Sequence, residues 1–184
     1  MRAALRTLVA REGFHGASMS TVAAEAGVAT GTAYTYYSSK QELILAAYVH
    51  TKAELAQAAT ADVDPAADPP SRFVQIWLAL YRHLAAHREH AVFLLQVECS
   101  PYRERAHAAS LAREADPLLE QAQRPDLAAR LAPLPIEVIY ELGLAPAVRL
   151  AAEERELGDE QLIAVAHACW RAVSVAPATA AAAA

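Results

Sequence analysis

The chain has 184 residues, 55% of them hydrophobic, and its 16 Lys and Arg against 21 Asp and Glu give a net charge of −5. This length fits one globular domain, or one with a small appendage. The acidic balance argues against a nucleic-acid partner, because such domains usually carry a basic surface. Its apolar runs are far shorter than the ~20 residues that cross a bilayer, so no membrane contact is expected. Only Cys99 and Cys169 are present, too few for a disulfide framework, so we expect a cytoplasmic protein.

Charge and helix-breaking residues divide the chain into two regions. Residues 1–52 hold five Lys and Arg against three Glu, a net charge of +2, whereas the remainder carries −7. Four of the six glycines lie in the first 31 residues, and all ten prolines lie at Pro65 or later. The basic first region is therefore compatible with DNA binding despite the acidic total. We expect its non-specific affinity for DNA to be modest and sensitive to salt.

The first region predicts short helices. A first helix ends at Gly13, and a second begins at Ser18 and ends at Gly27, with Val28 packed into the turn. A third helix runs over about residues 30–36, with Ala33 and Tyr37 facing inward, and Ser39 with Glu42 forms a capping box for a longer fourth.

The remainder also predicts helices, and β-strand patterns are nearly absent. We expect them from Ser71 onward, over 91–99 and 102–115, as one helix over 136–150, and after a cap at Gly158. The predicted fold is all-α, with about nine helices in total. Residues 178–184 are expected to form a frayed Ala-rich tail.

The second and third helices form a helix-turn-helix, whose second helix can lie in the major groove of DNA. Its outward face carries hydroxyl groups and aromatic edges without charge, namely Thr30, Thr32, Tyr34, Thr35 and Tyr36. Such groups suit contacts to phosphates and base edges. Gly31 leaves room for a close phosphate, and an anion would stabilise Lys40 in the first turn of its helix.

These residues resemble the DNA-binding domain of the tetracycline-repressor (TetR) family over about residues 3–48. The matching motifs are GFHGASM at 13–19, VAAEAGV at 22–28, GTAYTYY at 31–37 and KQEL at 40–43. Beyond them, only the helical plan and details such as LGLAPA at 142–147 match.

The resemblance implies a homodimeric repressor that binds double-stranded operator DNA and is released by a small-molecule effector. It implies an N-terminal three-helix DNA-binding domain at 1–48, then a larger ligand-binding and dimerisation domain at 49–177. Carried over by position, the base-facing residues are Thr30, Gly31, Thr32, Thr35 and Tyr36, and the phosphate-binding residues are Ser18, Tyr34 and Lys40.

Three features depart from the family pattern, one of them Ala33, which replaces a larger aliphatic residue. The family usually begins several residues earlier with a basic arm, so either the start is truncated or the contacts of that arm are missing. Ala29 stands where Ser commonly caps the recognition helix, which weakens the cap by about 1 kcal/mol.

Two further sets of residues are candidates in the second region. A ligand cavity could be lined by Trp77, Tyr81, Phe93, Gln96, Tyr102 and Tyr140, which equally fit an ordinary core. The last predicted helix is apolar on two sides, so one side is expected to meet another subunit. The dimer candidates are Leu150, Leu162, Val165, Ala166, Cys169, Trp170 and Val173.

Other functions find weaker support. His83, His87 and His90 share a helical face, which fits either a metal-responsive regulator or cationic residues at a solvated helix end. No metal site or cofactor is predicted, because no carboxylate or cysteine completes the set. Motifs for nucleophilic catalysis or phosphate-binding loops are absent, so we expect no enzyme. The alternative to a DNA-binding regulator is a helical small-molecule-binding protein or enzyme without DNA binding.

Overall fold

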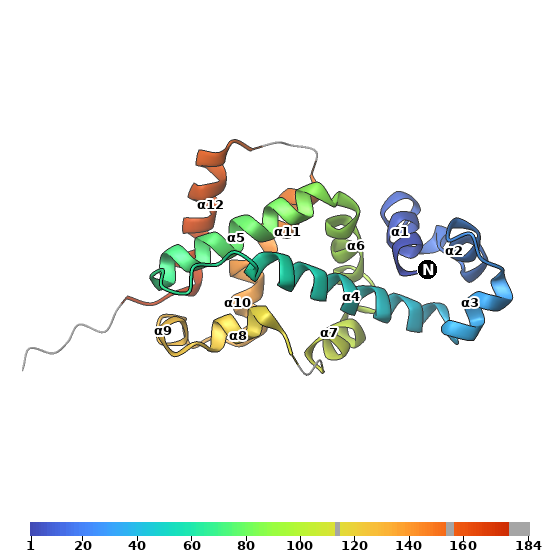
Figure 1. Cartoon of the computed structure of the whole chain (residues 1–184), viewed down its shortest axis with the longest axis horizontal. Coiled ribbons are helices and arrows are strands. Elements are labelled where there is room, and N and C mark those ends of the chain that lie inside the picture. Colours follow the sequence, from blue (N-terminus) through green and yellow to red (C-terminus); the bar gives the residue numbers. More distant parts are fainter. Residues whose placement is uncertain (113–114, 154–156, 177–184) are drawn as a thin grey trace, which may run out of the picture.

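The computed structural model describes residues 1–112, 115–153 and 157–176, which fold into helices and no β-strand, apart from one bridge between Leu131 and Ser174 (Figure 1). The all-α prediction is confirmed. The predicted tail at 178–184 lies outside the described residues.

The helices form a small head and a larger body joined by one long helix. The head consists of α1 (Arg2–Gly16), α2 (Met19–Glu25) and α3 (Thr30–Tyr36), and α4 (Lys40–Thr60) connects it to the body. The body consists of α5 (Pro69–Ala86), α6 (Arg88–Glu98), α7 (Arg103–Leu111), α8 (Pro117–Gln123), α9 (Pro125–Ala128), α10 (Ile136–Gly143), α11 (Ala145–Ala152) and α12 (Asp159–Val173). In Figure 1 the head and α12 lie at opposite ends of the molecule.

The helical elements outnumber the predicted nine partly because the segment 136–150 is two helices, not one. α10 ends at Gly143 and α11 begins at Ala145, with Pro146 in its first turn. Proline has no N–H to continue the helical ladder, so the chain turns here. Gly143 is buried, and a Cβ at this position would lie 3.3 Å from the Val173 side chain. Its missing side chain thus lets α10 pack closely on α12.

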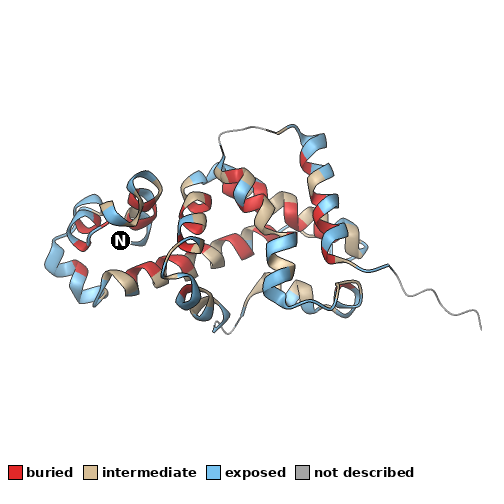
Figure 2. Ribbon diagram, turned by 180° about the vertical axis from the view of Figure 1, so that it is seen from behind, coloured by how far each residue is buried: buried red, intermediate tan, exposed pale blue. Residues whose placement is uncertain are grey.

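The apolar core runs through the body along α5 and extends into the head along α4. Trp77 on α5 is the largest fully buried side chain, and Leu43, Ile44 and Leu55 bury the inner face of α4. Figure 2 shows buried residues on the faces that the helices turn toward one another. α4 is continuous from Lys40 to Thr60 and so crosses the expected domain boundary at residue 48.

The buried side chain of Arg72 on α5 forms hydrogen bonds with α9 and with the segment before α5. Arg72 is 1% exposed, and its guanidinium donates hydrogen bonds to both carboxylate oxygens of Asp126, at 3.2 and 2.8 Å. It also donates to the carbonyl oxygens of Pro65 and Ala67. The hydrogen bond from Arg72 lowers the pKa of Asp126 from 3.8 to about 2.

We expect the Arg72–Asp126 pair to make the protein acid-sensitive. A carboxylate with a lowered pKa stabilises the fold above its ordinary pKa, and this contribution is lost as the pH falls from about 4 to about 2. The urea midpoint of the wild type should therefore decrease more steeply over this interval than that of Asp126→Asn. Parallel pH profiles for the two proteins would show that Asp126 adds no pH-dependent stability.

Candidate DNA-binding surface and ligand cavity

The turn between α2 and α3 is built by local signals. Ser18 Oγ accepts a hydrogen bond from the backbone N–H of Thr21, which caps α2 as predicted. Gly27 has φ +67°, a left-handed conformation that glycine adopts without strain. The expectation that Val28 fills the turn against the core is wrong, because this side chain is 37% exposed.

α3 presents a polar outer face to solvent. Thr30, Thr32 and Thr35 are exposed, and Tyr34 and Tyr36 are 53% and 70% exposed. On the inner face Ala33 is fully buried and Tyr37 is partly buried, as predicted. The structure therefore brings all the predicted base-facing side chains to one exposed surface.

No contact within the described protein explains the glycine at position 31. A Cβ built on Gly31 would have no neighbour within 4 Å, and its φ is not in the left-handed region. Alanine would also favour the helix by about 1 kcal/mol. A methyl group at position 31 would therefore meet no atom of the described protein.

Two of the three predicted phosphate-binding side chains already have partners in the protein. Ser18 Oγ caps α2 and lies 2.9 Å from Ser20 Oγ, while Tyr34 is exposed. Lys40 Nζ donates a hydrogen bond to the carbonyl oxygen of Phe14, near the end of α1. Burial lowers the pKa of Lys40. This carbonyl offsets the unfavourable position of a cation in the first turn of α4.

The start of α4 differs in detail from the predicted capping box. Ser39 Oγ accepts a hydrogen bond from the backbone N–H of Glu42, as expected. The Glu42 carboxylate, however, accepts hydrogen bonds from the backbone and hydroxyl of Ser38 instead of the backbone N–H of Ser39. These hydrogen bonds lower the pKa of Glu42.

The head is anchored to α4 by a buried arginine. Arg6 on α1 is 7% exposed, and its guanidinium donates to Thr51 Oγ1 at 3.3 Å and to Glu54 Oε2 at 3.2 Å. His50 Nδ1 lies 3.0 Å from the same Glu54 oxygen. α1 and α4 therefore form a tightly paired unit.

Aromatic packing joins the head to α6 and the start of α7, and one polar contact joins α7 to the start of α4. The ring of Phe14 contacts Tyr102 and Phe93 edge-on, with ring centres 5.3 and 6.5 Å away. Arg105 on α7 donates a hydrogen bond of 2.6 Å to the side chain of Gln41 on α4. Two predicted ligand residues, Phe93 and Tyr102, therefore lie at this junction.

A cavity of about 580 Å³ opens among α4, α5, α7, α8 and α10. Its wall is mainly apolar, with Phe73, Ile76, Leu118, Leu127, Ile139 and Leu144 among the lining side chains. This size and composition are typical of small-molecule sites.

Of the six predicted ligand residues, Tyr140 lines this cavity and the other five do not. Trp77 is fully buried and stacks on Tyr81 with the ring planes 7° apart, so both belong to the core. Gln96 is exposed on α6. Tyr48 and Lys52 on α4 were missed, because the sequence gives no sign that this helix contributes to the cavity.

Three polar residues of the cavity wall, Tyr48, Arg103 and His107, contact the carboxylate of Glu98, which is not itself a lining residue. His107 Nε2 lies 2.7 Å from Glu98 Oε1, and Arg103 Nε donates to Glu98 Oε2 at 3.0 Å. Burial opposes ionisation of Glu98, but these hydrogen bonds outweigh it and lower the pKa of the carboxyl. Burial also raises the pKa of Tyr48, whose hydroxyl donates to Glu98, so this phenol stays neutral.

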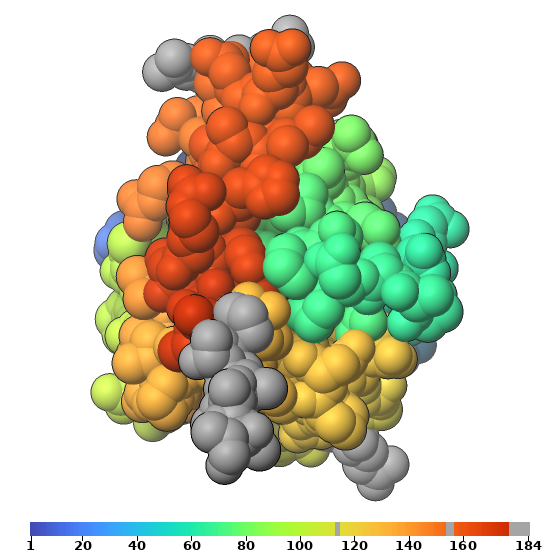
Figure 3. Space-filling model, turned by 90° about the vertical axis from the view of Figure 1, so that its left-hand side faces the viewer, coloured from blue at the N-terminus to red at the C-terminus, as the bar shows by residue number. Residues whose placement is uncertain are grey.

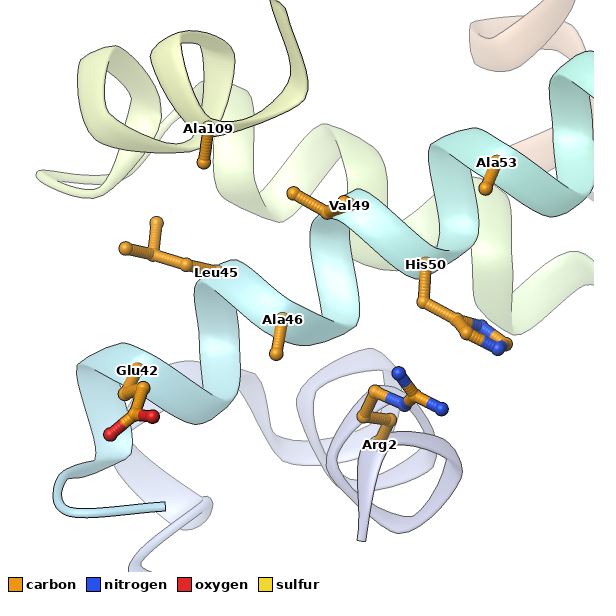
Figure 4. Close-up of a pocket in the computed structure, with 8 residues that line it drawn as sticks. All are labelled: Arg2, Glu42, Leu45, Ala46, Val49, His50, Ala53 and Ala109. Carbon is orange, nitrogen blue, oxygen red and sulfur yellow. The ribbon is translucent and has the colours of Figure 1, made fainter. Parts of the chain in front are cut away.

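A second hollow follows the solvent side of α4. Figure 4 shows this open apolar groove between Arg2 on α1 and Ala109 on α7, with Leu45, Val49 and Ala53 from α4 along its floor. Its openness makes it a surface depression and not an enclosed site for a small molecule.

His83, His87 and His90 lie together where α5 meets α6, with ring centres 4.9 to 6.0 Å apart. Among the described residues no group of three or more His, Cys, Asp or Glu could hold a metal ion. The alternative of cationic residues at a solvated helix end is wrong for His90, which is buried. Burial and the charge of Arg6 lower the pKa of His90 to about 4.

The apolar dimer candidates on α12 pack inside the protomer. The buried set is Leu162, Ala166, Cys169, Trp170 and Val173, while Val165 and, on α11, Leu150 are partly buried. Trp170 packs on Phe73 of α5 with ring centres 5.3 Å apart. This face of α12 is therefore covered by the body and is not free to meet another subunit.

An exposed helix-turn-helix is a DNA-binding motif, and one long helix joins it here to a body with an apolar cavity. Within the described ranges, no helix has both the length and the apolar character needed to span a bilayer.

The comparisons assign the family. Residues 2–47 match the family model described as bacterial regulatory proteins, tetR family, and residues 70–174 match the tetracyclin repressor-like C-terminal domain. An uncharacterized HTH-type transcriptional regulator of Haemophilus influenzae is 30% identical over 172 residues, covering 90% of this chain and 89% of the relative. The chain belongs to the TetR family, whose members are transcription regulators and not enzymes.

Solved structures of TetR-family regulators share the whole fold. One from Haemophilus influenzae is 27% identical with a TM-score of 0.75, over 95% of this chain and 94% of that chain. One described as a putative regulator from Shewanella sp. PV-4 is also 27% identical, with a TM-score of 0.76, over 95% and 96%. One from Vibrio parahaemolyticus is 28% identical, with a TM-score of 0.73, over 95% and 97%.

Proposed function

We propose that the protein is a ligand-responsive transcriptional repressor that binds a palindromic operator as a homodimer and is released when a small molecule enters the body cavity. Each subunit would place α3 in the major groove, with half-site centres about 34–36 Å apart. The outer face of α3, with its hydroxyl groups and exposed tyrosines, supports direct contact with bases and phosphates.

The observation that carries ligand response is the continuity of α4. This helix begins at Lys40 beside the recognition helix and supplies Tyr48 and Lys52 to the cavity wall. A ligand that binds more tightly to one position of α4 would shift the spacing of the two recognition helices. It could do so only through this difference in affinity.

A gel shift with the upstream region of the protein's own gene tests the proposal. We expect a retarded complex at low salt, and its loss in the presence of a small molecule that native mass spectrometry finds on the purified protein. No shift at low salt would favour the alternative of a helical small-molecule-binding protein, which the missing side-chain cap at Ala29 supports.

Lys40 is expected to contribute charge to DNA binding without reading sequence. Lys40→Met should weaken binding to all DNA sequences alike and reduce the slope of log affinity against log salt by about 0.9, the value for one phosphate contact. Fluorescence anisotropy from 50 to 300 mM salt measures this slope. Arg149→Met removes an exposed cation from α11 in the body and serves as the matched control. An unchanged slope for Lys40→Met would assign this lysine only to its contact with the Phe14 carbonyl.

For the dimer, the outward face of α12 is the surface we propose. Ile163 is 41% exposed, and Ala164, His167, Ala168 and Arg171 are exposed beside it. These positions follow helical spacing, and the small residues would let a second α12 approach closely. Figure 3 shows α12 lying on the surface at this end of the molecule.

Ala168→Arg should therefore convert the dimer to monomers, because it puts a long charged side chain at the centre of this face. Size-exclusion chromatography with light scattering measures the mass. Ala24→Arg makes the same change on an exposed site of α2, at the other end of the molecule, and should remain dimeric. A dimeric Ala168→Arg protein would exclude this face as the interface.

A further inference from the structure

We propose that the body cavity selects an apolar organic molecule with a single negative charge, and that Lys52 pairs with that charge. The inference rests on the proposed function, because it names the class of molecule that the effector site would accept.

The argument begins with the cations of the cavity wall. Arg103 is held by Glu98 at 3.0 Å and by Glu141 at 3.9 Å, and His107 is held by Glu98 at 2.7 Å. Lys52 has no carboxylate within 4 Å among the described residues. Its ammonium group instead lies 4.0 Å from the centre of the Tyr140 ring. In the part of the chain that the structure describes, the Lys52 ammonium of this wall therefore has no carboxylate as a partner.

The acidic residues of the wall limit the charge that a ligand can carry. Glu104, Glu137 and Glu141 line the cavity and are exposed, whereas Lys52 is partly buried. Water screens the charges of the three glutamates. Together these charges still disfavour a second negative charge on the part of the ligand that lies toward the exposed side of the wall. Asp116 also lines the cavity and caps α8. This distribution favours a monoanion over a polyphosphate or a dicarboxylate.

The other side chains of the cavity wall indicate the chemistry of the uncharged part of the ligand. Phe73, Ile76 and Leu118 are among the apolar side chains that would cover a hydrocarbon or aromatic body. Gln121 Oε1 is buried and has no hydrogen-bond partner among the described residues. This atom requires a donor from water or from the ligand, and it adds no charge. The described wall therefore combines the Lys52 ammonium with apolar side chains and a buried amide oxygen, while its three glutamates are exposed to solvent.

Displacement of the fluorescent probe N-phenyl-1-naphthylamine, which is neutral and apolar, tests the inference. The competitors are decanoate, 1-decanol and decylamine at pH 7.5, because they share a ten-carbon chain and differ in head-group charge. We expect decanoate to displace the probe from the wild type at a concentration at least 10-fold lower than 1-decanol, with decylamine weakest.

Lys52→Met should raise the half-displacing concentration of decanoate to that of 1-decanol, each corrected for that protein's own affinity for the probe, whereas Lys52→Arg should keep the preference for decanoate. Arg149→Met lowers the net charge equally outside the cavity and should behave as the wild type. Circular dichroism confirms that each variant is folded. A preference for decylamine, a preference for decanoate that survives in Lys52→Met, or no binding of the probe would each overturn the inference.

The same proteins separate this inference from the proposed function. Without ligand, Lys52→Met should shift the upstream DNA as the wild type does. If the wild type binds this DNA but shows no preference for decanoate, only the choice of ligand class fails. If the preference depends on Lys52 but no protein binds DNA, the ligand class stands and the repressor function fails.

Discussion

Gly31→Ala should weaken operator binding by roughly 10- to 100-fold, which corresponds to about 1.4–2.8 kcal/mol of binding free energy, while the fold becomes no less stable. The added methyl group meets nothing in the protein, since no atom lies within 4 Å of the position it would occupy. Alanine also favours the helical conformation by about 1 kcal/mol. A loss of affinity without a loss of stability would therefore mean that the methyl group collides with DNA.

Fluorescence anisotropy with operator DNA and thermal unfolding of the free protein measure the two effects. Gly158→Ala is the matched control, because Gly158 is also exposed with open space around its Cβ position but lies before α12, far from the head. We expect the control to bind DNA as the wild type does. Wild-type affinity in Gly31→Ala would remove position 31 from the DNA interface.

Trp77→Ala should lower the free energy of unfolding by about 3–5 kcal/mol, as is typical when a buried aromatic side chain is removed. Trp77 is fully buried on α5 and stacks on Tyr81 with ring centres 6.0 Å apart. A typical domain has only about 5–15 kcal/mol of stability, so this loss is large. Binding of the naphthylamine probe should persist at temperatures where the variant is folded, because Trp77 is not part of the cavity wall.

Urea unfolding followed by circular dichroism measures this loss of stability. Leu142→Ala truncates a side chain that is 44% exposed and should change the stability by less than about 0.5 kcal/mol. If Trp77→Ala kept its stability and lost the probe, Trp77 would belong to the ligand site after all.

The head could be predicted largely from local sequence. Ser18 and Ser39 cap their helices, and Gly27 turns the chain between α2 and α3 as expected. Each of these signals acts within about four residues, so the sequence contains both partners of the interaction. The outer face of α3 follows in the same way from its spacing around the buried Ala33.

The body could be predicted only as a set of helices. Trp77, Phe93 and Tyr102 are aromatic residues of three different predicted helices, and the sequence does not distinguish a core position from a cavity wall. The cavity instead includes Tyr48 and Lys52, because α4 extends beyond the head and packs beside α7 and α8. Likewise, the apolar stripe of α12 is covered by α5 and α10 of the same protomer.

The sequence by itself determined the helical class, the helix-turn-helix and the polar face of its second helix, because caps, glycines and periodicity act over short distances along the chain. Only the tertiary structure decided which side chains surround the cavity and which partners the charged groups find. Lys40 meets the carbonyl of Phe14, and Lys52 lies over the ring of Tyr140. These contacts join residues 26 and 88 positions apart, and they depend on how whole helices pack.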